Sequence, residues 1–466
     1  MKRIMALIAV LILLSTACAE SYPAYVWGDD GASFALLLDA DGTILTPVDQ
    51  YAMIYPITDD GDERALFCAA ILDEDGEFDS CVLMNDRGEI LLDRSFQALE
   101  FRRNTILATE LSGCMTALDA DGNVLLAGGY GWIEPNGEGG YLALKTGESF
   151  DSDAGKTYPV VAVDAEGEET ETGVISDFWS HGWYSEGLCR TNDYSNSDGG
   201  ETRYLDADGN IAFTVSGYAD DFEGGHLILF DDQGQYHLLN ASGDDALGKA
   251  YASLSFDSTL GDRARFIAAD DRGAIEILNP ETLECESTIA PCGTKVWSAM
   301  QPENGLIFVW WYADRSRIYD LAGKLLFENL DYATTEVNLT YMVQGDDSVS
   351  RFVRSSGAYP DQVQTLIDES GNALGEGHSY IDGLSSLKGA ARYLVTDYEV
   401  DRSDEPVVID ESVRYGVCDE TGKMVIPAEY DSIEMLAWNH YWVNKGEKWG
   451  MIDESEQWLA TVDTDK

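Results

Sequence analysis

The sequence predicts an all-β repeat protein with a β-propeller-like fold, and three observations carry this prediction. An acidic or amide residue, two variable residues and a glycine recur about every 40 residues, between runs of strand-forming residues. Further turn signals between these positions suggest about four strands in each unit. Residues 20–466 show no amphipathic helical periodicity. Because the turns outnumber the blades of an ordinary propeller, two smaller propellers and an open β-solenoid are alternative arrangements.

The first segment, residues 1–19, has the features of a secretory signal peptide. A basic start precedes the apolar run Ile4 to Leu14, which is too short to span a bilayer as a permanent helix. The small residues Ala17-Cys18-Ala19 fit a cleavage site, and "LLSTAC" also resembles a bacterial lipobox with Cys18 as the lipid attachment residue. We therefore expect a protein that is secreted or anchored at the outer face of a bacterial cell envelope. It would touch the membrane only through a lipid on Cys18.

The composition limits the classes of partner. The chain of 466 residues has 85 Asp and Glu against 29 Lys and Arg, which gives a formal net charge of −56 at pH 7. Such a field repels phosphate backbones, so nucleic acid is not an expected partner. Hydrophobic residues make up 45% of the chain, too many for a disordered acidic protein. An extracellular glycan or protein ligand fits this composition.

The recurring element has a direct physical interpretation as a hairpin turn. Asp or Asn in the first position hydrogen-bonds the backbone of its own turn, and Gly takes the positive φ that other residues avoid. We assign residues 20–400 to divergent hairpin repeats of this kind. The first turn positions are Asp39, Asn85, Asp119, Asp164, Asp206, Asn240, Asn279, Asp320, Asp368, Asp419 and Asp453.

Residues 413–464 carry a more specific pattern. The stretch "YGVCDETGKMVIPAEYDSI" has Tyr415-Gly416, then Asp419, Gly422-Lys423 and a later Tyr-Asp pair, and Trp449-Gly450 begins the next unit. This segment resembles the WG-repeat family of bacterial proteins, and the resemblance implies a repeat array that these units close. Asp419 is interpreted as a turn residue and not as a catalytic acid, because the same Asp recurs in unit after unit.

Catalytic and metal-binding patterns are weak. "DADG" at Asp39, Asp119 and Asp206 resembles the centre of a calcium loop, but the carboxylate two residues earlier is missing each time. We expect no cofactor, with weak Ca²⁺ binding by the acidic surface as the alternative. The sequence contains no nucleophile elbow and no phosphate-binding loop. We therefore expect a non-enzymatic binding or scaffold protein, with a propeller-type glycan hydrolase as the alternative, because two well-placed carboxylates suffice for that reaction.

Clusters of aromatic residues are the candidate ligand contacts. Aromatic rings beside polar groups suit a glycan or a peptide, whereas packing between neighbouring sheets is the competing interpretation. The candidate residues are Trp179, Trp183, Trp310, Trp311 and Trp442.

Two cysteines flank one predicted hairpin. In "CAAILDEDGEFDSC", Cys68 and Cys81 lie at equal distances from a turn centred between residues 74 and 75. A two-residue loop would place them directly opposite, where a disulfide needs only a small approach of the two Cβ atoms. We predict this disulfide, with two reduced, core-facing thiols as the alternative.

Overall fold

The computed structural model contains two compact units, one of residues 91–328 and one that combines residues 1–90 with residues 329–466. The predicted signal peptide and Cys18 lie outside the described residues. The structure describes residues 21–27, 33–48, 50–58, 65–73, 78–150, 156–193, 201–216, 218–291, 293–303, 305–312, 315–329, 338–342, 351–357, 359–368, 370–384, 391–403, 406–437, 439–446 and 448–463.

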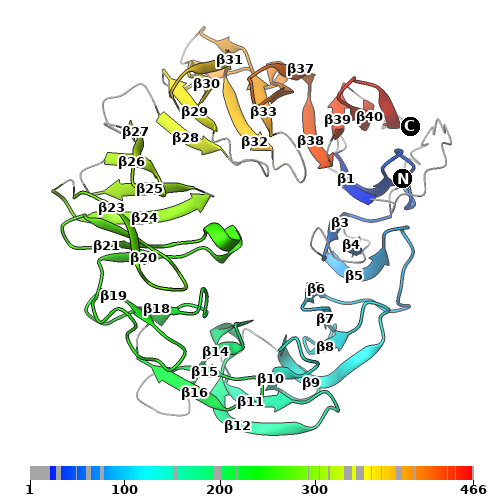
Figure 1. Ribbon diagram of the computed structural model, residues 1–466. Coiled ribbons are helices and arrows are strands. Elements are labelled where there is room, and N and C mark those ends of the chain that lie inside the picture. The colour runs from blue at the N-terminus through cyan, green and yellow to red at the C-terminus, as the bar shows by residue number, and fades with distance from the viewer. Residues whose placement is uncertain are drawn as a thin grey trace. The chain divides into compact units, whose positions relative to one another are not determined.

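The unit of residues 91–328 is built from antiparallel sheets in chain order, coloured cyan to green in Figure 1. Its largest sheet has seven strands: β6 (Ala98–Arg102), β7 (Thr105–Thr109), β8 (Met115–Leu118), β9 (Val124–Pro135), β10 (Tyr141–Lys145), β11 (Tyr158–Val163) and β12 (Glu169–Ser176). A 3-10 turn, η2 (Phe178–Ser180), leads to the sheet of β13 (His181–Ser185), β14 (Leu188–Asp193), β15 (Glu201–Leu205) and β16 (Ile211–Val215).

Three further sheets complete this unit. They are β17 (Tyr218–Ala219), β18 (Leu227–Phe230) and β19 (Tyr236–Leu239); then β20 (Ser253–Ser255), the 3-10 segment η3 (Ser258–Arg263), β21 (Phe266–Ala269), β22 (Ile275–Leu278) and β23 (Cys285–Ile289); and β24 (Val296–Glu303), β25 (Leu306–Trp311), β26 (Arg315–Asp320) and β27 (Leu325–Asn329).

The other unit takes sheets from both ends of the chain. The N-terminal part has β1 (Ser21–Trp27) with β2 (Ser33–Asp39), and β3 (Met53–Pro56) with β4 (Leu66–Leu72) and β5 (Phe78–Asn85). The C-terminal part has β28 (Asn338–Met342), β29 (Arg351–Ser356), β30 (Val363–Ile367) and β31 (Ala373–His378); β32 (Tyr380–Leu384), β33 (Arg392–Asp397), β36 (Arg414–Asp419) and β37 (Met424–Tyr430); and β38 (Ser432–Ala437), β39 (His440–Lys445), β40 (Lys448–Asp453) and β41 (Trp458–Asp463). A small hairpin of β34 (Val400–Asp401) and β35 (Val407–Val408) and the 3-10 turn η4 (Asp410–Ser412) are inserted between β33 and β36.

Most of these sheets are four-stranded, antiparallel blades of a propeller-like fold, so the predicted all-β repeat class is confirmed. Three sheets with fewer strands are extended by single bridges, such as Leu38 with Ile44, Met84 with Ile90 and Leu239 with Asp245. Among the described residues, none of the helices has the length and apolar character that crossing a membrane requires.

Two predicted units merge in the seven-stranded sheet. The long strand β9 pairs with β8 through its first half and with β10 through its second half, and Tyr130 is opposite both Met115 and Lys145. Gly128 and Gly129 take φ of +84° and +82° where the strand changes partner. Figure 1 shows β9 continuing from one half of the sheet into the other.

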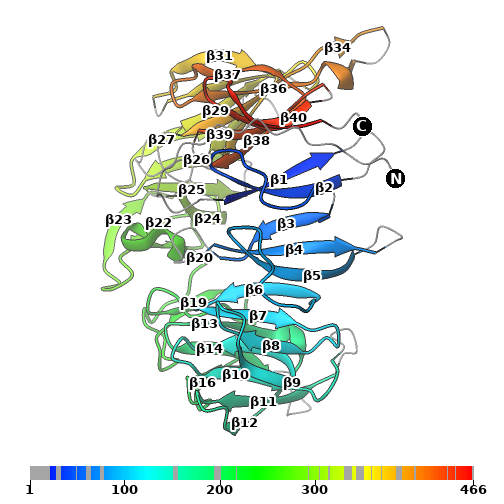
Figure 2. The same cartoon turned by 90° about the vertical axis from the view of Figure 1, so that its right-hand side faces the viewer.

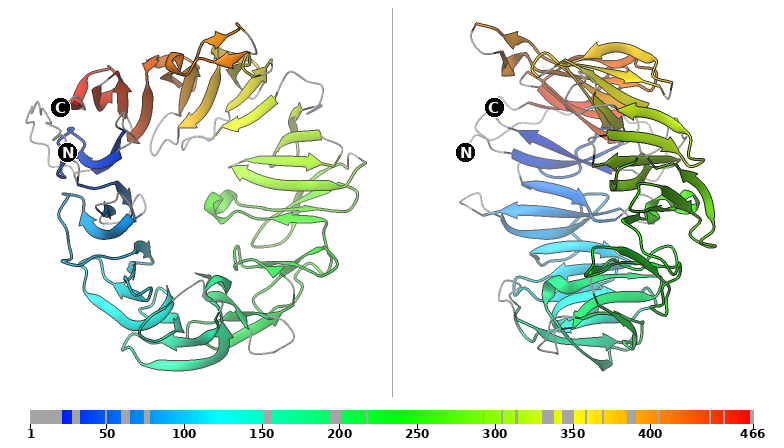
Figure 3. Two further views of the ribbon diagram at one scale, coloured as in Figure 1. Left: turned by 180° about the vertical axis from the view of Figure 1, so that it is seen from behind. Right: turned by 90° about the vertical axis from the view of Figure 1, so that its left-hand side faces the viewer.

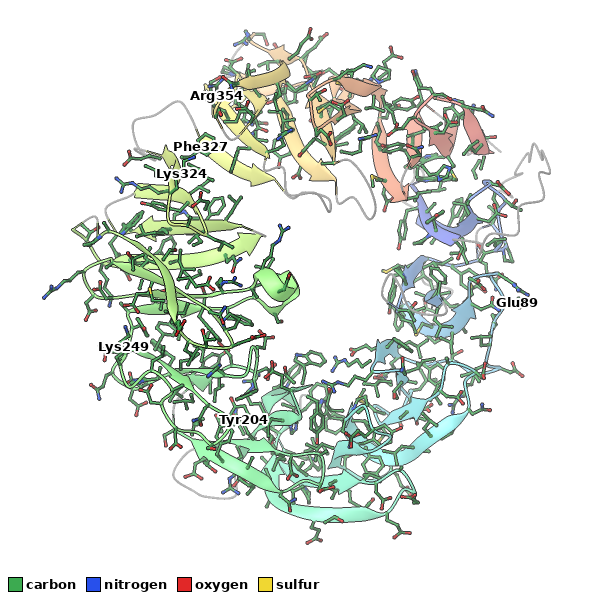
Figure 4. All side chains as sticks on the ribbon, viewed as in Figure 1. Glu89, Tyr204, Lys249, Lys324, Phe327 and Arg354 are labelled. Carbon is green, nitrogen blue, oxygen red and sulfur yellow. The ribbon has the colours of Figure 1, made fainter. Side chains whose placement is uncertain are left out.

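The repeated turns have the predicted geometry. Asp419 accepts hydrogen bonds on Oδ1 from the backbone N–H groups of Thr421 and Lys423, at 2.9 and 3.1 Å, and Gly422 takes a φ of +75°. In the four-stranded sheets, such turns join the third strand to the fourth, as the turn at Asp419 joins β36 to β37. Glu89, labelled in Figure 4, ends one of them. The same carboxylate contact to the fifth residue of the turn occurs at Asp39, Asp119, Asp206, Asp320 and Asp368.

The turn glycines have a second role that the sequence did not reveal. A Cβ atom on Gly422 would lie 2.3 Å from the carbonyl oxygen of Leu374, on the outermost strand of the preceding blade. The same approach occurs at Gly88, where Leu45 O would be 2.7 Å from the added atom. The turn therefore joins two strands of its own blade and also packs against the preceding blade.

The first and last blades pack on each other in the same way. A Cβ on Gly42 would be 2.9 Å from the backbone of Leu459 in β41. Trp442 donates its Nε1–H to the carbonyl oxygen of Tyr25 at 2.6 Å. Figure 2 shows β1 beside β38, and Figure 3 shows the blue N-terminal strands beside the red C-terminal blade. The shared core consists of Ala24, Val26, Phe34, Leu36, Leu38, Trp442, Trp449, Met451 and Val462.

Candidate functional site

The five candidate tryptophans have different environments. Trp311 and Trp442 are 2% and 1% exposed, because both point into cores that join neighbouring sheets. The prediction that these two contact ligand is therefore wrong. Trp310 is half-buried and stacks on Phe308 with ring centroids 5.4 Å apart. Trp179 and Trp183 are 71% and 50% exposed, and these two are brought together.

Trp179 and Trp183 line a cavity of about 620 Å³ in the unit of residues 91–328. The cavity lies between the β6–β9 half of the seven-stranded sheet and the segment formed by η2 and β13. This volume falls within the usual range of small-molecule pockets. Its aromatic lining is Trp132, Phe150, Phe178, Trp179, His181 and Trp183, and its polar side chains include Gln97, Glu100, Arg102, Thr109 and Ser112.

The η2 turn fixes the position of Trp179. Asp177 caps the turn by accepting a hydrogen bond from the Trp179 backbone N–H at 3.0 Å. Phe178 packs against Phe150, with centroids 5.3 Å apart, and presents its ring edge-on to Trp179 at 5.0 Å. The indole of Trp179 is therefore held at its base while its face remains open to solvent.

Trp183 is held by a cation–π contact. The guanidinium carbon of Arg102 lies 3.1 Å from the centroid of the Trp183 ring. Arg102 also pairs with Glu134 at 3.0 Å and with Glu100 at 2.6 Å, so one cation is held between two carboxylates and an aromatic face.

Glu134 holds this arrangement in place and is not part of the cavity lining. Its side chain is buried and accepts hydrogen bonds from the Tyr184 N–H and from Arg102, both at 3.0 Å. Burial raises the pKa of Glu134, and these two donors oppose that shift. Because β13 carries Tyr184 next to Trp183, Glu134 ties β9 to the strand that presents the exposed indole.

His181 forms part of the cavity wall. It stacks on Trp132 with centroids 4.1 Å apart and planes 15° apart, and its Nδ1 lies 3.0 Å from the Thr191 hydroxyl. Burial lowers the pKa of His181 to about 3, so the imidazole is neutral near pH 7. The wall at this position is polar and uncharged.

Arg102, Glu134 and His181 were not identified from the sequence, because nothing in their spacing connects β6, β9 and β13. One signal was available in the repeated Gly-Trp pairs at 131–132 and 182–183. A Cβ on Gly131 would lie 2.7 Å from the Phe150 ring, and one on Gly182 would lie 3.0 Å from the Arg190 Cβ. Each glycine therefore lies where a larger side chain would not fit.

The aromatic-glycine residues of the C-terminal repeat have a structural role. A Cβ on Gly450 would be 2.9 Å from the Trp458 ring, and one on Gly416 would be 2.7 Å from the Ala428 backbone nitrogen. Trp449 is buried and faces Trp442 at 6.4 Å. Tyr415 is half-buried against the core that joins the last two blades. None of these residues lines the cavity.

The predicted opposition of Cys68 and Cys81 is wrong. Cys81 is paired with Ala70 and Cys68 with Leu83, because the pair Leu72 and Phe78 is already one residue away from the predicted register and an irregularity between Ile71 and Leu72 adds one more. The two cysteines are diagonal neighbours in the core, and the structure has no disulfide between them. A hydrogen bond with the Cys68 thiol, together with burial, raises the pKa of Cys81.

The turn carboxylates are already engaged by their own backbone. Asp39, Asp119 and Asp206 each accept two backbone N–H groups on Oδ1. Over the part of the chain that the structure describes, no group of three or more His, Cys, Asp and Glu residues is arranged to hold a metal ion.

Comparison with solved structures returns low overall similarity. A eukaryotic initiation factor has 12% identity and a TM-score of 0.39, with 77% of this chain and 95% of that chain covered. BamB from Moraxella catarrhalis has 14% identity and a TM-score of 0.27, with coverage of 73% and 95%. Sqt1 from Saccharomyces cerevisiae has 10% identity and a TM-score of 0.28, with coverage of 66% and 91%. Likenesses at this level carry no argument about function.

Sequence comparison is informative at one place in the chain. No curated protein matches the sequence. Residues 415–449, which run from the start of β36 into β40, match the family described as "WG containing repeat". The matched segment contains the turn at Asp419 and ends on Trp449. The predicted assignment of this C-terminal segment to the WG-repeat family is thus confirmed.

Proposed function

We propose that this protein is a non-enzymatic binding protein of the bacterial cell surface or its surroundings, and that it binds its ligand in the cavity beside Trp179 and Trp183. The observation that carries the proposal is the exposure of these two indoles at one cavity, while Trp311 and Trp442 are buried in cores. A large exposed aromatic ring held on a rigid base loses little entropy when it binds.

The alternative function, hydrolysis of a glycan, receives less support from the same cavity. A glycosidase needs two carboxyl groups on either side of the bond that is cleaved. Glu134 is engaged by Arg102 and by the Tyr184 N–H, and it does not line the cavity. Glu100 is the carboxylate that remains at the surface of the cavity, and it pairs with Arg102.

The binding function is tested by screening the purified mature protein against glycan and peptide libraries. Ligands found with the wild type are then measured with Trp179→Ala and Trp297→Ala. Trp297 is a matched control, because it is 67% exposed in the same unit and does not line the cavity. We expect Trp179→Ala to lose binding by at least ~10-fold and Trp297→Ala to keep it. Equal binding by all three proteins would refute the assignment.

Location outside the cytoplasm is part of the proposal, and it is supported by the apolar run before Cys18. Metabolic labelling with a fatty acid should tag the wild type and not Cys18→Ala if the protein is anchored. An unlabelled protein that starts at Glu20 and is found in the medium would instead establish release. Retention of the intact N-terminus in the cytoplasm would contradict both outcomes.

A further inference from the structure

The charges around the cavity restrict the class of ligand, and this step rests on the binding function proposed above. Arg102 is the cation of the lining, and both Glu100 and Glu134 already pair with it, at 2.6 and 3.0 Å. An anionic ligand would have to compete with two carboxylates for this guanidinium. It would also enter a protein with a formal net charge of −56.

A cationic ligand is disfavoured by the same arrangement. Glu100 is the carboxylate at the cavity surface, and Arg102 holds it. Arg102 also covers one face of Trp183, where a ligand cation would otherwise stack. The guanidinium of Arg102 would therefore repel a ligand cation both at Glu100 and at the Trp183 ring.

A purely apolar ligand fits no better. The cavity combines open aromatic faces with the uncharged side chains of Gln97, Thr109 and Ser112. Covering these polar groups without a hydrogen bond would cost free energy for each group that lost its water. A fitting ligand has an apolar face for the indole and a rim of neutral hydroxyl or amide groups.

We propose that the cavity binds a short neutral oligosaccharide, with one sugar ring stacked on Trp179 and its hydroxyl groups directed at the polar lining. A pyranose ring has an apolar C–H face and a neutral polar rim, which match the two parts of the lining. Arg102 acts as a positioning residue, because it holds Trp183 through its stacking contact while Glu100 and Glu134 neutralise its charge.

The first experiment compares matched ligands by isothermal titration calorimetry on the full mature protein. The probes are chito-oligosaccharides and cello-oligosaccharides (neutral), oligogalacturonides (acidic), fully deacetylated chitosan oligosaccharides (cationic) and an aromatic peptide. We expect a neutral series to bind at least ~10-fold more tightly than its charged counterpart, and Trp179→Ala to abolish that binding. Trp297→Ala should bind like the wild type.

The possible outcomes separate the two proposals. Binding of the acidic, cationic or peptide probe that depends on Trp179 would overturn the neutral-glycan inference and leave the binding function intact. The absence of any Trp179-dependent ligand among the probes and libraries would overturn both.

A second experiment uses a change of specificity as its readout. Glu100→Gln removes one of the two carboxylates that neutralise Arg102, and the exposed position of Glu100 makes the variant compatible with folding. We expect the ratio of acidic to neutral oligosaccharide affinity to rise by at least ~3-fold. Gln97→Glu, which adds a carboxylate at the same cavity, should lower that ratio. An unchanged ratio in both variants would show that charge at Arg102 does not select the ligand.

Discussion

At the scale of single residues, one position departs from the repeated turn and shows how the turn works. The turn that starts at Asp453 has Glu456 where most of the other turns have glycine, and Glu456 takes a φ of +59°. Its side chain accepts a hydrogen bond at 3.0 Å from the hydroxyl of Tyr430, on the outermost strand of the preceding blade. The joint between blades is therefore made here by a side chain instead of by close backbone approach.

This arrangement predicts an order of stability among variants of Glu456. Glu456→Ala should lower the free energy of unfolding by about 1–2 kcal/mol, because the buried Tyr430 hydroxyl loses its acceptor. Glu456→Gly should lower it less, because glycine removes a left-handed penalty of about 1 kcal/mol. Glu456→Gln keeps an acceptor and should remain closest to the wild type. Urea unfolding measures the series, and a glycine variant less stable than the alanine variant would contradict the strain argument.

His237 predicts a dependence of stability on pH. Partial burial lowers its pKa, but hydrogen bonds to Asp245 and Asp231 raise it to a net value above the usual one. Because the pKa is raised in the folded state, the protonated His237 imidazole stabilises the fold, and this stabilisation is fully present below the pKa of the unfolded chain. It is lost as the pH rises through the pKa of the folded protein.

His237→Gln should therefore lower the melting temperature more at pH 5.5 than at pH 8.5, where less of the wild-type imidazole is protonated. Thermal unfolding of both proteins at the two pH values gives the loss of melting temperature caused by the substitution at each pH, and the two losses are then compared. A larger loss at pH 8.5 would reverse the sign and disprove the ion-pair interpretation.

At the scale of the element, the turn glycines allow backbone strain to be separated from contact with the neighbouring blade. Gly422 and Gly167 both have positive φ, at +75° and +86°, and both occupy the same position of the turn. A Cβ on Gly422 would meet Leu374 O at 2.3 Å, whereas a Cβ on Gly167 would meet nothing within 4 Å. The turn with Gly167 joins β11 to β12 within the merged seven-stranded sheet.

Gly167→Ala should therefore lower the free energy of unfolding by about 1–2 kcal/mol, because alanine is strained in the left-handed backbone conformation. Gly422→Ala should cost that amount and a further ~1–3 kcal/mol, because β31 or β37 must shift to admit the methyl group. Chemical denaturation of the two variants gives the comparison. Equal losses would mean that the close approach to Leu374 adds no free energy.

At the scale of the whole molecule, one compact unit depends on contacts between residues more than 400 positions apart. Trp442 in the last blade is covered by Ala24, Val26 and neighbouring residues of the first blade, and it donates a hydrogen bond to Tyr25 O. The two ends of the chain therefore form one cooperative core. The N-terminal strand β1 pairs with β2 in a two-stranded sheet, and the C-terminal blade supplies much of its packing.

Trp442→Ala should destabilise the protein by about 3–5 kcal/mol and should increase hydrogen exchange in residues 21–27. Trp442→Phe keeps most of the buried area and should lose only about 1 kcal/mol for the hydrogen bond. Mass-spectrometric hydrogen exchange locates the effect, with Trp297→Ala as the exposed control. Unchanged exchange in residues 21–27 of the alanine variant would show that β1 is stable without the last blade.

The sequence by itself determined the local structure of this protein. The Asp-x-x-Gly turns, the strands beside them and the WG-type segment at its C-terminal end all depend on residues within a few positions of each other. Hydrogen bonds such as those of Asp419 Oδ1 are local, so the pattern predicts them directly. The same locality explains why the recurring Asp was correctly assigned to a turn.

Only the tertiary structure decided which of these residues meet across the chain. The register of β4 with β5 differs from that of a two-residue hairpin, in part through the irregularity between Ile71 and Leu72, and this displaces Cys81 from Cys68; no sequence pattern marks such an irregularity. The exposure of Trp179 and the burial of Trp442 depend on which sheet packs against each ring, although both are tryptophans in similar aromatic clusters. Likewise, Arg102, Glu134 and Trp183 come from three strands distant in sequence, and their contact arises only when β6, β9 and β13 pack together.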